Sequence, residues 1–389
     1  MKPTSLFILF FFLLFFVFCS NETNNYDSEN LIDLNQLSQV SIFDLFESID
    51  VVQLETNDNS LISTITKVIF SNDRYYIYDA RQQMLFCFDS SGKFLFKIDR
   101  KGQGPDEYLH LGDFNVDSFN NQLLLLEPFG HLLVFDLDGH FAEKIRLPKE
   151  IKAYNLVYPL DKDNLVFISL NEYYMVLYSR IKNEIIDKRY KIDMELRSLF
   201  SIPRKTYIYN DNVFFSKPPL TNDIVNLSND TEFSWNFGKD NNTENQINKL
   251  KKMVISEDDR GERDYVGEGR VNYMIYINHE SSRYKICVLD CGKFKFKYVF
   301  YDKILKKPIV FEKTKENIFL ILANFYGEHI IMHEGRLSPN KNDPRVTDSL
   351  ITEITSYYSR DILTNEQKKI IDSHNEEDNP FLIKYNMKQ

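Results

Sequence analysis

The sequence predicts an all-β fold, a six-bladed β-propeller that carries a helical insertion and C-terminal helices packed on its side. Three observations lead to this prediction. Phe and Tyr are abundant at 32 and 23 residues, while Gly and Pro are sparse at 13 and 12, a composition that favours strands in a chain of 389 residues. A unit of strands and short turns recurs along the chain. The number of recurrences fits six blades.

The recurring unit is clearest where one stretch of sequence matches another 47 residues further on. Residues 87–98, CFDSSGKFLFKI, align with residues 134–145, VFDLDGHFAEKI. In both, a turn that ends in glycine, Gly92 or Gly139, separates two apolar runs. This is a strong hairpin signal, because glycine adopts positive φ without steric cost. Residues 292–297, GKFKFK, repeat the same turn and strand, and hairpins repeated every 40 to 50 residues or so indicate propeller blades.

Counting turns and strands gives six candidate blades. They cover residues 61–98, 109–147, 153–191, 205–238, 270–301 and 315–336. Two strand-like stretches lie outside this count, residues 49–54 near the start and residues 380–385 near the end. Closed propellers often complete one blade with strands from both chain ends, which removes an exposed edge, and we therefore expect these two stretches to close the ring.

Two segments interrupt the strand pattern. Residues 242–263 are polar with helical spacing, and we expect an inserted helix and a loop there. Residues 347–373 place apolar side chains at intervals that fit amphipathic helices packed against the side of the propeller.

The chain begins with an export signal. Residues 6–18 are thirteen uninterrupted apolar residues, which is the length of a signal-peptide core and short of the ~20 that a membrane-spanning helix needs. Cys19 and a polar tract follow, an arrangement that resembles the lipobox of bacterial lipoproteins, in which this cysteine is acylated and becomes the N-terminus. We expect a lipoprotein signal peptide over 1–19, a flexible tether over 20–40 and the propeller over 41–389. An uncleaved anchor and ordinary secretion are the alternatives.

The charge balance and the cysteine count exclude two classes of protein. Lys and Arg number 47 against 57 Asp and Glu, a net charge of −10, so we expect no nucleic-acid partner. After cleavage at Cys19 three cysteines remain, an odd number that does not describe a disulfide framework. Cys87 and Cys287 lie within apolar runs and are predicted to be buried thiols. The spacing of Cys287 and Cys291 does not suit zinc.

Three motifs together resemble a known family. Residues 100–108 read RKGQGPDEY, residues 113–117 read DFNVD, and residues 376–383 read EEDNPFLI. They resemble the six-bladed β-propeller lipoproteins of Bacteroides-type bacteria, whose fold is similar to the NHL and TolB-like propellers. The resemblance covers almost the whole mature chain. It implies a propeller fold and a place in the cell envelope, and it implies no reaction, because that family has no well-established activity.

No familiar catalytic signature occurs in the sequence, so we expect no catalytic residues, no metal ligands and no cofactor. The G-x-S-x-G, G-x4-G-K-[S/T] and H-E-x-x-H patterns are absent. His329 and His333 have the spacing of a helical metal site, but they follow a strand-like run, and residues four apart along a strand lie about 13 Å from each other. One ion cannot bridge that distance.

Two polar loops are the candidate ligand-binding sites, at one mouth of the central channel. The residues of the first loop are Arg100, Gly102, Gly104, Glu107 and Tyr108, and those of the second are Arg260 and Arg263. The first loop would supply a charge, a hydrogen-bond acceptor and a stacking face for a polar ligand. Both loops also have a purely structural interpretation: the glycines of the first permit positive φ as the chain crosses between blades, and the charges of the second form a solvated face.

Two functions from different classes remain open. We favour a cell-envelope lipoprotein whose propeller is a non-enzymatic binding or scaffold domain, held to the membrane by its lipid anchor and binding an envelope protein, a glycan or a peptide. The alternative is a metal-dependent hydrolase or lyase, in which side chains from several blades converge on a divalent cation at the channel mouth. The sequence does not decide between the two functions, because it does not show which distant loops come together in the fold.

Overall fold

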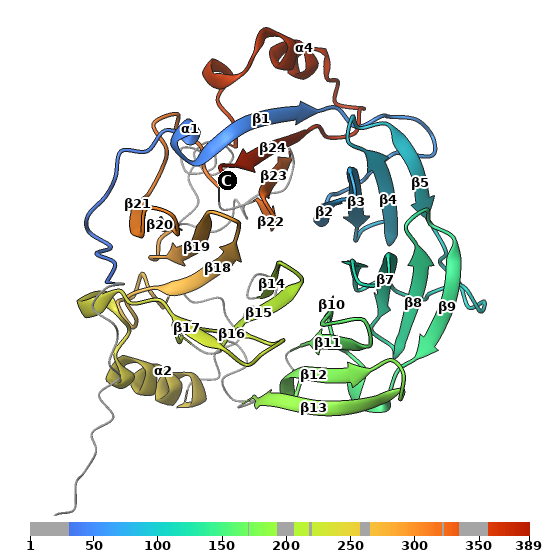
Figure 1. Cartoon of the computed structure of the whole chain (residues 1–389), viewed down its shortest axis with the longest axis horizontal. Helices are drawn as coiled ribbons and strands as arrows, with labels where there is room; N and C mark the ends of the chain where they lie inside the picture. Colours follow the sequence, from blue (N-terminus) through green and yellow to red (C-terminus); the bar gives the residue numbers. More distant parts are fainter. Residues whose placement is uncertain are drawn as a thin grey trace, which may run out of the picture.

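The computed structural model describes residues 31–169, 171–192, 206–217, 220–256, 265–320, 323–333 and 357–389. Its strands form six four-stranded antiparallel sheets around a central axis (Figure 1). In the first five blades the chain runs from the innermost strand to the outermost strand, and then crosses to the innermost strand of the next blade. The prediction of a six-bladed β-propeller is confirmed.

The first three blades are each built from consecutive strands. Blade 1 contains β2 (Lys67–Ser71), β3 (Arg74–Asp79), β4 (Met84–Asp89) and β5 (Phe94–Ile98). Blade 2 contains β6 (Asp113–Asp117), β7 (Gln122–Glu127), β8 (His131–Asp136) and β9 (Phe141–Arg146). Blade 3 contains β10 (Leu156–Pro159), β11 (Asn164–Ile168), β12 (Tyr173–Ser179) and β13 (Glu184–Lys191).

Blades 4 and 5 follow the same order, and blade 6 does not. Blade 4 contains β14 (Thr206–Tyr209), β15 (Asn212–Ser216), β16 (Asp223–Asn226) and β17 (Glu232–Ser234). Blade 5 contains β18 (Met274–Glu280), β19 (Tyr284–Asp290), β20 (Phe296–Asp302) and β21 (Lys307–Phe311). Blade 6 joins β22 (Asn324–Tyr326), β23 (His329–His333), β24 (Leu382–Met387) and β1 (Phe46–Val52).

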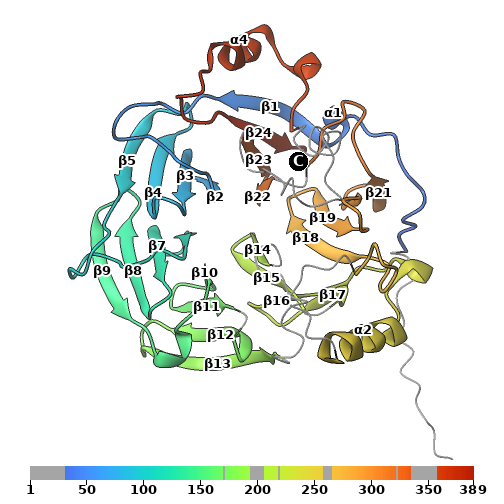
Figure 2. The same cartoon turned by 180° about the vertical axis from the view of Figure 1, so that it is seen from behind.

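Blade 6 closes the ring with strands from both ends of the chain. β1 pairs antiparallel with β24, from Phe46 opposite Met387 to Val52 opposite Leu382. Figure 2 shows β1 as the outermost strand of this blade, with β24 directly inside it. The expected closure by the two terminal stretches is confirmed, and it leaves no gap between the first and last blades.

The repeated turns form as the sequence pattern predicts. Gly92 and Gly139 have φ values of +89° and +84°. The side chain of Asp89 accepts hydrogen bonds from two backbone N–H groups of its turn, and Asp136 does the same in the matching turn. A side chain at position 92 would also meet the carbonyl oxygen of Gln53 at 2.1 Å, so glycine is required there for space as well as for conformation.

Helices lie on the outside of the ring. The expected inserted helix is α2 (Glu244–Ser256), beside blade 4, and α4 (Asn365–Ser373) packs against β1. The Gln367 side chain of α4 donates a hydrogen bond to the backbone carbonyl of Ile49 at 2.6 Å. The other helices of the described residues are short: α1 (Ile42–Leu45) and the 3-10 turns Lys149–Ile151, Gly238–Asp240 and Arg360–Ile362. Within the described ranges no helix has the length and apolar character to cross a membrane.

Parts of both predicted helical segments cannot be compared with the structure. Residues 257–263 of the insertion and residues 347–356 of the C-terminal segment lie outside the described residues. The described part of the C-terminal segment confirms one amphipathic helix on the side of the propeller, because Ile370 and Ile371 of α4 pack against the core of blades 5 and 6.

Residues 31–40 pack along the outside of the ring, although the sequence assigns them to the tether. Ile32 and Leu34 are only 2% and 4% exposed, and they cover the ring of Trp235 in one apolar cluster. The N–H of Ile32 donates to the carbonyl of Asn236 at 2.9 Å. The reason is burial: these apolar side chains remove both themselves and the aromatic surface beneath them from water.

The apolar core lies between neighbouring blades and contains the predicted thiols. Cys87 and Cys287 are fully buried and Cys291 is half-buried, and none of these three cysteines is in a disulfide. Burial raises the pKa of Cys87 to about 12 and that of Cys291 to about 11, so neither forms a thiolate at neutral pH. The prediction that Cys87 and Cys287 are buried thiols is confirmed.

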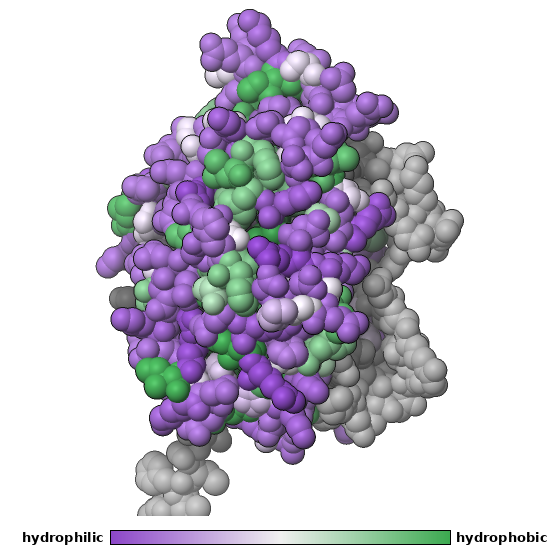
Figure 3. All heavy atoms as spheres, turned by 90° about the vertical axis from the view of Figure 1, so that its right-hand side faces the viewer, coloured by the Kyte–Doolittle hydropathy of each residue, from purple (hydrophilic) through white to green (hydrophobic). Residues whose placement is uncertain are grey.

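The outer edges of the blades are protected by polar side chains. Seen from the side that carries β5 and β9, the surface is mostly hydrophilic and its apolar patches are separate (Figure 3). The edge strand β9 reads FAEKIR, with adjacent charges of opposite sign. Charged side chains on an edge strand oppose pairing with another chain.

Candidate functional site

A cavity of about 470 Å³ lies on the propeller axis. The innermost strands of all six blades line it, namely β2, β6, β10, β14, β18 and β22. It therefore collects side chains from positions as distant in sequence as Thr66 and Tyr326. This volume is in the range of pockets that enclose small molecules.

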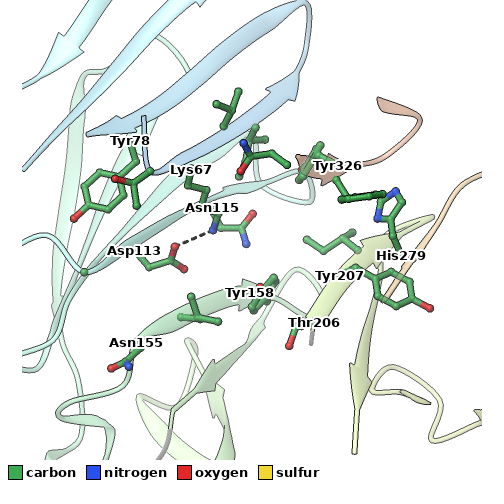
Figure 4. A pocket seen from close by; sticks show the side chains of 18 of the residues that line it. Lys67, Tyr78, Asp113, Asn115, Asn155, Tyr158, Thr206, Tyr207, His279 and Tyr326 are labelled. Carbon is green, nitrogen blue, oxygen red and sulfur yellow. Dashed lines mark hydrogen bonds and ion pairs between the residues drawn. The ribbon is translucent and has the colours of Figure 1, made fainter. Parts of the chain in front are cut away.

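An ion pair between two neighbouring blades is the main charged feature of the cavity (Figure 4). Lys67 Nζ on β2 lies 2.8 Å from Asp113 Oδ1 on β6, and it also donates to the carbonyl of Phe114 at 2.6 Å. The side chain of Asp113 is 3% exposed and that of Lys67 is 24% exposed. Burial raises the pKa of Asp113, while the positive charge of Lys67 opposes that rise. The two charges neutralise each other at the cavity wall.

The same wall is joined to blade 3. Asp113 Oδ2 accepts a hydrogen bond from the N–H of Val157 at 3.1 Å, and Asn115 Nδ2 donates to the carbonyl of Val157 at 3.0 Å. Lys67 Nζ lies 5.8 Å from the centre of the Tyr158 ring, a cation–π distance. Blades 1 to 3 therefore hold this side of the cavity in one geometry by their own contacts.

His279, on β18, borders the cavity as a neutral imidazole. Its Nε2 lies 2.7 Å from the carbonyl oxygen of Gly327, and a carbonyl only accepts, so Nε2 carries the proton. Burial lowers the pKa of His279 to about 4. Nδ1 is then a hydrogen-bond acceptor, and it is buried with no partner among the described residues.

Asn324, on β22, contributes an unpaired donor to the same cavity. Its Nδ2 is buried and has no hydrogen-bond partner in the part of the chain that the structure describes. The nearby Asn278 differs, since it accepts from Trp235 Nε1 at 2.8 Å and donates to Ser216 Oγ at 2.5 Å. Buried polar atoms nearly always have partners, and here two unpaired atoms belong to residues that line one cavity.

Aromatic side chains make up much of the remaining wall. Tyr78, Tyr158, Tyr207, Phe325 and Tyr326 all border the cavity. Figure 4 shows Tyr78 on the side of the ion pair, and Tyr207 and Tyr326 on the side of His279. Burial raises the pKa of Tyr326 to about 12, so its hydroxyl stays neutral at physiological pH.

The first predicted loop, between β5 and β6, is occupied by bonds among its own residues. Arg100 forms an ion pair with Asp106, and Glu107 Oε2 accepts from the N–H of Gly104 at 2.7 Å. The glycines do not have the expected positive φ. A Cβ at Gly102 would lie 2.0 Å from Glu107 Oε2, so a larger residue there would displace the Glu107 carboxylate.

Tyr108 is fully buried beneath this loop, and its hydroxyl donates to the carbonyl of Gln83 at 2.5 Å. None of the five predicted loop residues is among the described residues that line the cavity. The loop does lead to the cavity, because His110 and Gly112 border it. The side chain of Gln83 fixes the chain between them by accepting from the N–H of Leu111 at 2.7 Å.

The second predicted loop cannot be placed, since Arg260 and Arg263 lie outside the described residues. Cys19 also lies outside them.

Lys67, His279 and Asn324 are not among the site residues predicted from the sequence. Asp113 stood in one of the family motifs, but without a role. Their position in the strands could have indicated three of the site residues. Lys67 and Asp113 are the first residues of β2 and β6, and Asn324 is the first residue of β22. First residues of innermost strands lie near one end of the channel, whereas His279 is the sixth residue of β18 and has no such signal.

No group of three or more His, Cys, Asp or Glu side chains that could hold a metal ion occurs among the described residues. His329 and His333 lie at the two ends of β23, as four-residue spacing on a strand requires. His329 Nδ1 lies 2.9 Å from Asn386 Oδ1, a hydrogen bond between neighbouring strands.

The fold and the cavity define a class: six-bladed β-propellers with a ligand-sized site on the axis. A model of the family described as domain of unknown function DUF4934 matches residues 28–386. The chain belongs to this family. No curated protein matches it in sequence.

Two solved structures share the fold. One is a candidate exported protein from Bacteroides fragilis NCTC 9343, 17% identical, with a TM-score of 0.62 over 91% of this chain and 98% of that chain. The other is a member of the DUF4221 family from Bacteroides vulgatus ATCC 8482, 8% identical, with a TM-score of 0.50 over 88% of this chain and 97% of that chain. At these identities the likeness concerns the fold.

Proposed function

We propose that this protein is a lipid-anchored component of the cell envelope that binds a small polar ligand in the central channel of its propeller. The observation that carries the proposal is the cavity on the axis, which is bordered by a buried ion pair and by two unpaired polar atoms, His279 Nδ1 and Asn324 Nδ2. A mostly apolar pocket with a few convergent polar groups is typical of small-molecule sites.

The unpaired atoms give such a ligand a source of binding energy. A buried donor or acceptor without a partner costs a folded protein about 1–3 kcal/mol. A ligand that bonds to His279 Nδ1 and Asn324 Nδ2 removes this cost from the complex but not from the free protein. The cavity walls need little rearrangement, because Lys67, Asp113 and Asn115 are already held by contacts between blades.

The use of the charged groups supports binding rather than catalysis. Asp113 is engaged by Lys67 and by the N–H of Val157, and His279, with a pKa of about 4, is a weak base at neutral pH. The metal-dependent hydrolase or lyase would need at least three convergent ligands, and the described residues offer no such group. No observation therefore favours that alternative.

The anchor is supported by the N-terminal sequence, where the apolar run 6–18 is followed by Cys19 and a polar tract. Mass spectrometry of the membrane fraction should show an acylated N-terminal Cys19, and Cys19→Ser should lose the lipid and leave the membrane. Cys291→Ser is the matched control and should stay there. Unmodified mature protein in the soluble fraction would contradict the anchor.

The channel site is tested by filling it. Ile208 borders the cavity, whereas Ile186 lies on the outer strand β13 and is 45% exposed, so Ile208→Trp and Ile186→Trp make the same change in and away from the site. In a screen of sugars, amino acids and peptides by thermal shift, we expect hits with the unmodified protein and Ile186→Trp that Ile208→Trp loses. Hits that survive Ile208→Trp would place binding elsewhere.

A further inference from the structure

We propose that the channel ligand is an uncharged, hydroxyl-rich ring, that is, a neutral saccharide of one or two units. This inference rests on the proposed function, because it names the class of ligand for the same cavity. The charge of the cavity wall, its unpaired atoms and its aromatic side chains each support it.

The charge of the wall favours a neutral ligand. Apart from tyrosines, the ionisable groups among the described lining residues are Lys67, His110, Asp113 and His279. Lys67 and Asp113 neutralise each other at 2.8 Å, and His279 is neutral because of its low pKa. A ligand with a net charge would leave water without gaining a counter-charge in the cavity, which is unfavourable.

The unpaired atoms favour hydroxyl groups. His279 Nδ1 needs a donor and Asn324 Nδ2 needs an acceptor, and the two residues lie on the innermost strands of neighbouring blades, β18 and β22. A hydroxyl group both donates and accepts, so the hydroxyl groups of one ligand offer the donor that His279 Nδ1 needs and the acceptor that Asn324 Nδ2 needs. Asn115 adds further capacity, because its amide has one proton and one lone pair left after its two bonds to the backbone.

The aromatic side chains favour a ring with apolar faces. Tyr158 and Tyr326 border the cavity with neutral hydroxyls, and the Phe325 ring lies 5.6 Å from the His279 ring. Figure 4 places Tyr158 and Tyr326 between the ion pair and His279. Such walls bury the C–H faces of a flat ring while its edge meets the polar groups.

A short peptide fits these features less well. Amide groups also donate and accept, but a free dipeptide carries two charged termini, and Lys67 and Asp113 of the described wall are already paired with each other. An internal peptide segment would have to thread along the axis and leave several backbone groups unpaired in a mostly apolar cavity.

The test compares neutral sugars with charged sugars that have the same ring. The probes are glucose and N-acetylglucosamine, with glucuronate and glucosamine as charged counterparts and maltose as the two-unit sugar. They are titrated into the purified full-length chain by calorimetry. We expect a neutral sugar to bind at least tenfold more tightly than the matching charged one. Equal or tighter binding of the charged sugars, or no binding of any neutral sugar, would overturn the inference.

Asn324→Leu separates a ligand contact from a structural role. Because Asn324 Nδ2 has no partner among the described residues, this variant should melt at the same temperature as the unmodified protein or higher. It should bind the neutral sugar about three- to tenfold more weakly, as expected for one lost hydrogen bond. Asn59→Leu, at an exposed asparagine outside the cavity, is the matched control and should bind normally. Unchanged binding by Asn324→Leu would contradict the proposed contact.

A failure of this inference can be told from a failure of the proposed function. If N-acetylalanine methylamide, an uncharged amide, binds and Ile208→Trp abolishes its binding while no sugar binds, the cavity is a ligand site and the saccharide inference is wrong. If sugars bind equally well to Ile208→Trp, both the channel site and the inference are wrong.

Discussion

The side-chain oxygen of Asn379 accepts a hydrogen bond from the backbone N–H of Ile62 at 2.7 Å, across 317 residues of sequence. The amide nitrogen of Asn379 donates to the carbonyls of Glu55 and Ser60, each at 2.8 Å. Asn379 is fully buried. One side chain therefore ties the segment before β24 to the segment that leads from β1 to β2, next to the closure of the ring.

Asn379→Ala should lower the free energy of unfolding by about 2–4 kcal/mol, because it leaves several buried backbone groups without partners. Chemical denaturation measures the effect. Asn375→Ala is the control, since Asn375 is exposed and bonds locally to Asp378, and it should change stability by less than about 1 kcal/mol. Equal effects of the two variants would show that Asn379 does not tie the segments together.

Deletion of residues 379–389 should abolish cooperative unfolding. It removes β24, the strand that pairs with both β1 and β23, and so exposes the edges of two strands at once. We expect aggregation or a broad melting transition by circular dichroism. A transition as sharp as that of the intact chain would be incompatible with the closure described here.

Lys67→Met should lower stability at pH 7 by about 3–5 kcal/mol, because it leaves the Asp113 carboxylate buried without its counter-charge. The loss should shrink as the pH falls below the raised pKa of Asp113, because the protonated carboxyl carries no charge. Lys182→Met, which breaks an exposed pair with Glu184, should cost less than about 1 kcal/mol at any pH. A loss for Lys67→Met that does not depend on pH would argue against an unpaired carboxylate as its cause.

His279 should make stability depend on pH between about 6.5 and about 4. In this window the unfolded histidine binds a proton that folded His279 does not, so the free energy of unfolding falls as the pH falls, by up to roughly 3 kcal/mol. Above pH 6.5 the contribution is fully present. His279→Gln should flatten the profile measured by urea unfolding, and His140→Gln, at an exposed histidine, should not. A steep profile in His279→Gln would assign the dependence to other groups.

The fold was predictable because its signals are local. In the turns at Asp89 and Asp136, the aspartate side chain bonds to the backbone of its own turn. The two turns have similar sequences 47 residues apart, so one sequence is enough to recognise the repeated blades. The closure of the ring was predictable because two strand-like stretches, residues 49–54 and 380–385, lay outside the six counted blades. The packing of Ile32 and Leu34 in one cluster with Trp235 was not, because a few apolar residues near the chain start give no sign of which distant surface they cover.

The cavity could not be predicted from the sequence. Lys67 and Asp113 meet only because β2 and β6 begin side by side on neighbouring blades, and His279 and Asn324 come from two further blades. Arg100 and Glu107 were predicted to bind a ligand because they are charged and lie near glycines in one loop. In the structure their charges serve the loop itself, through Asp106 and the N–H of Gly104.

The pairing of β1 with β24 determines when the molecule can become complete. β1 is the first strand to be synthesised and β24 is the last, so β1 has no partner in its sheet until the final residues of the chain have appeared. Blades 1 to 5 contain only consecutive strands and can form as the chain lengthens. Because joining the two ends costs the entropy of closing a long loop, we expect ring closure to be the slow step in folding. Until that step, the edges of β1 and β23 have no partner strand and are open to pairing with other chains.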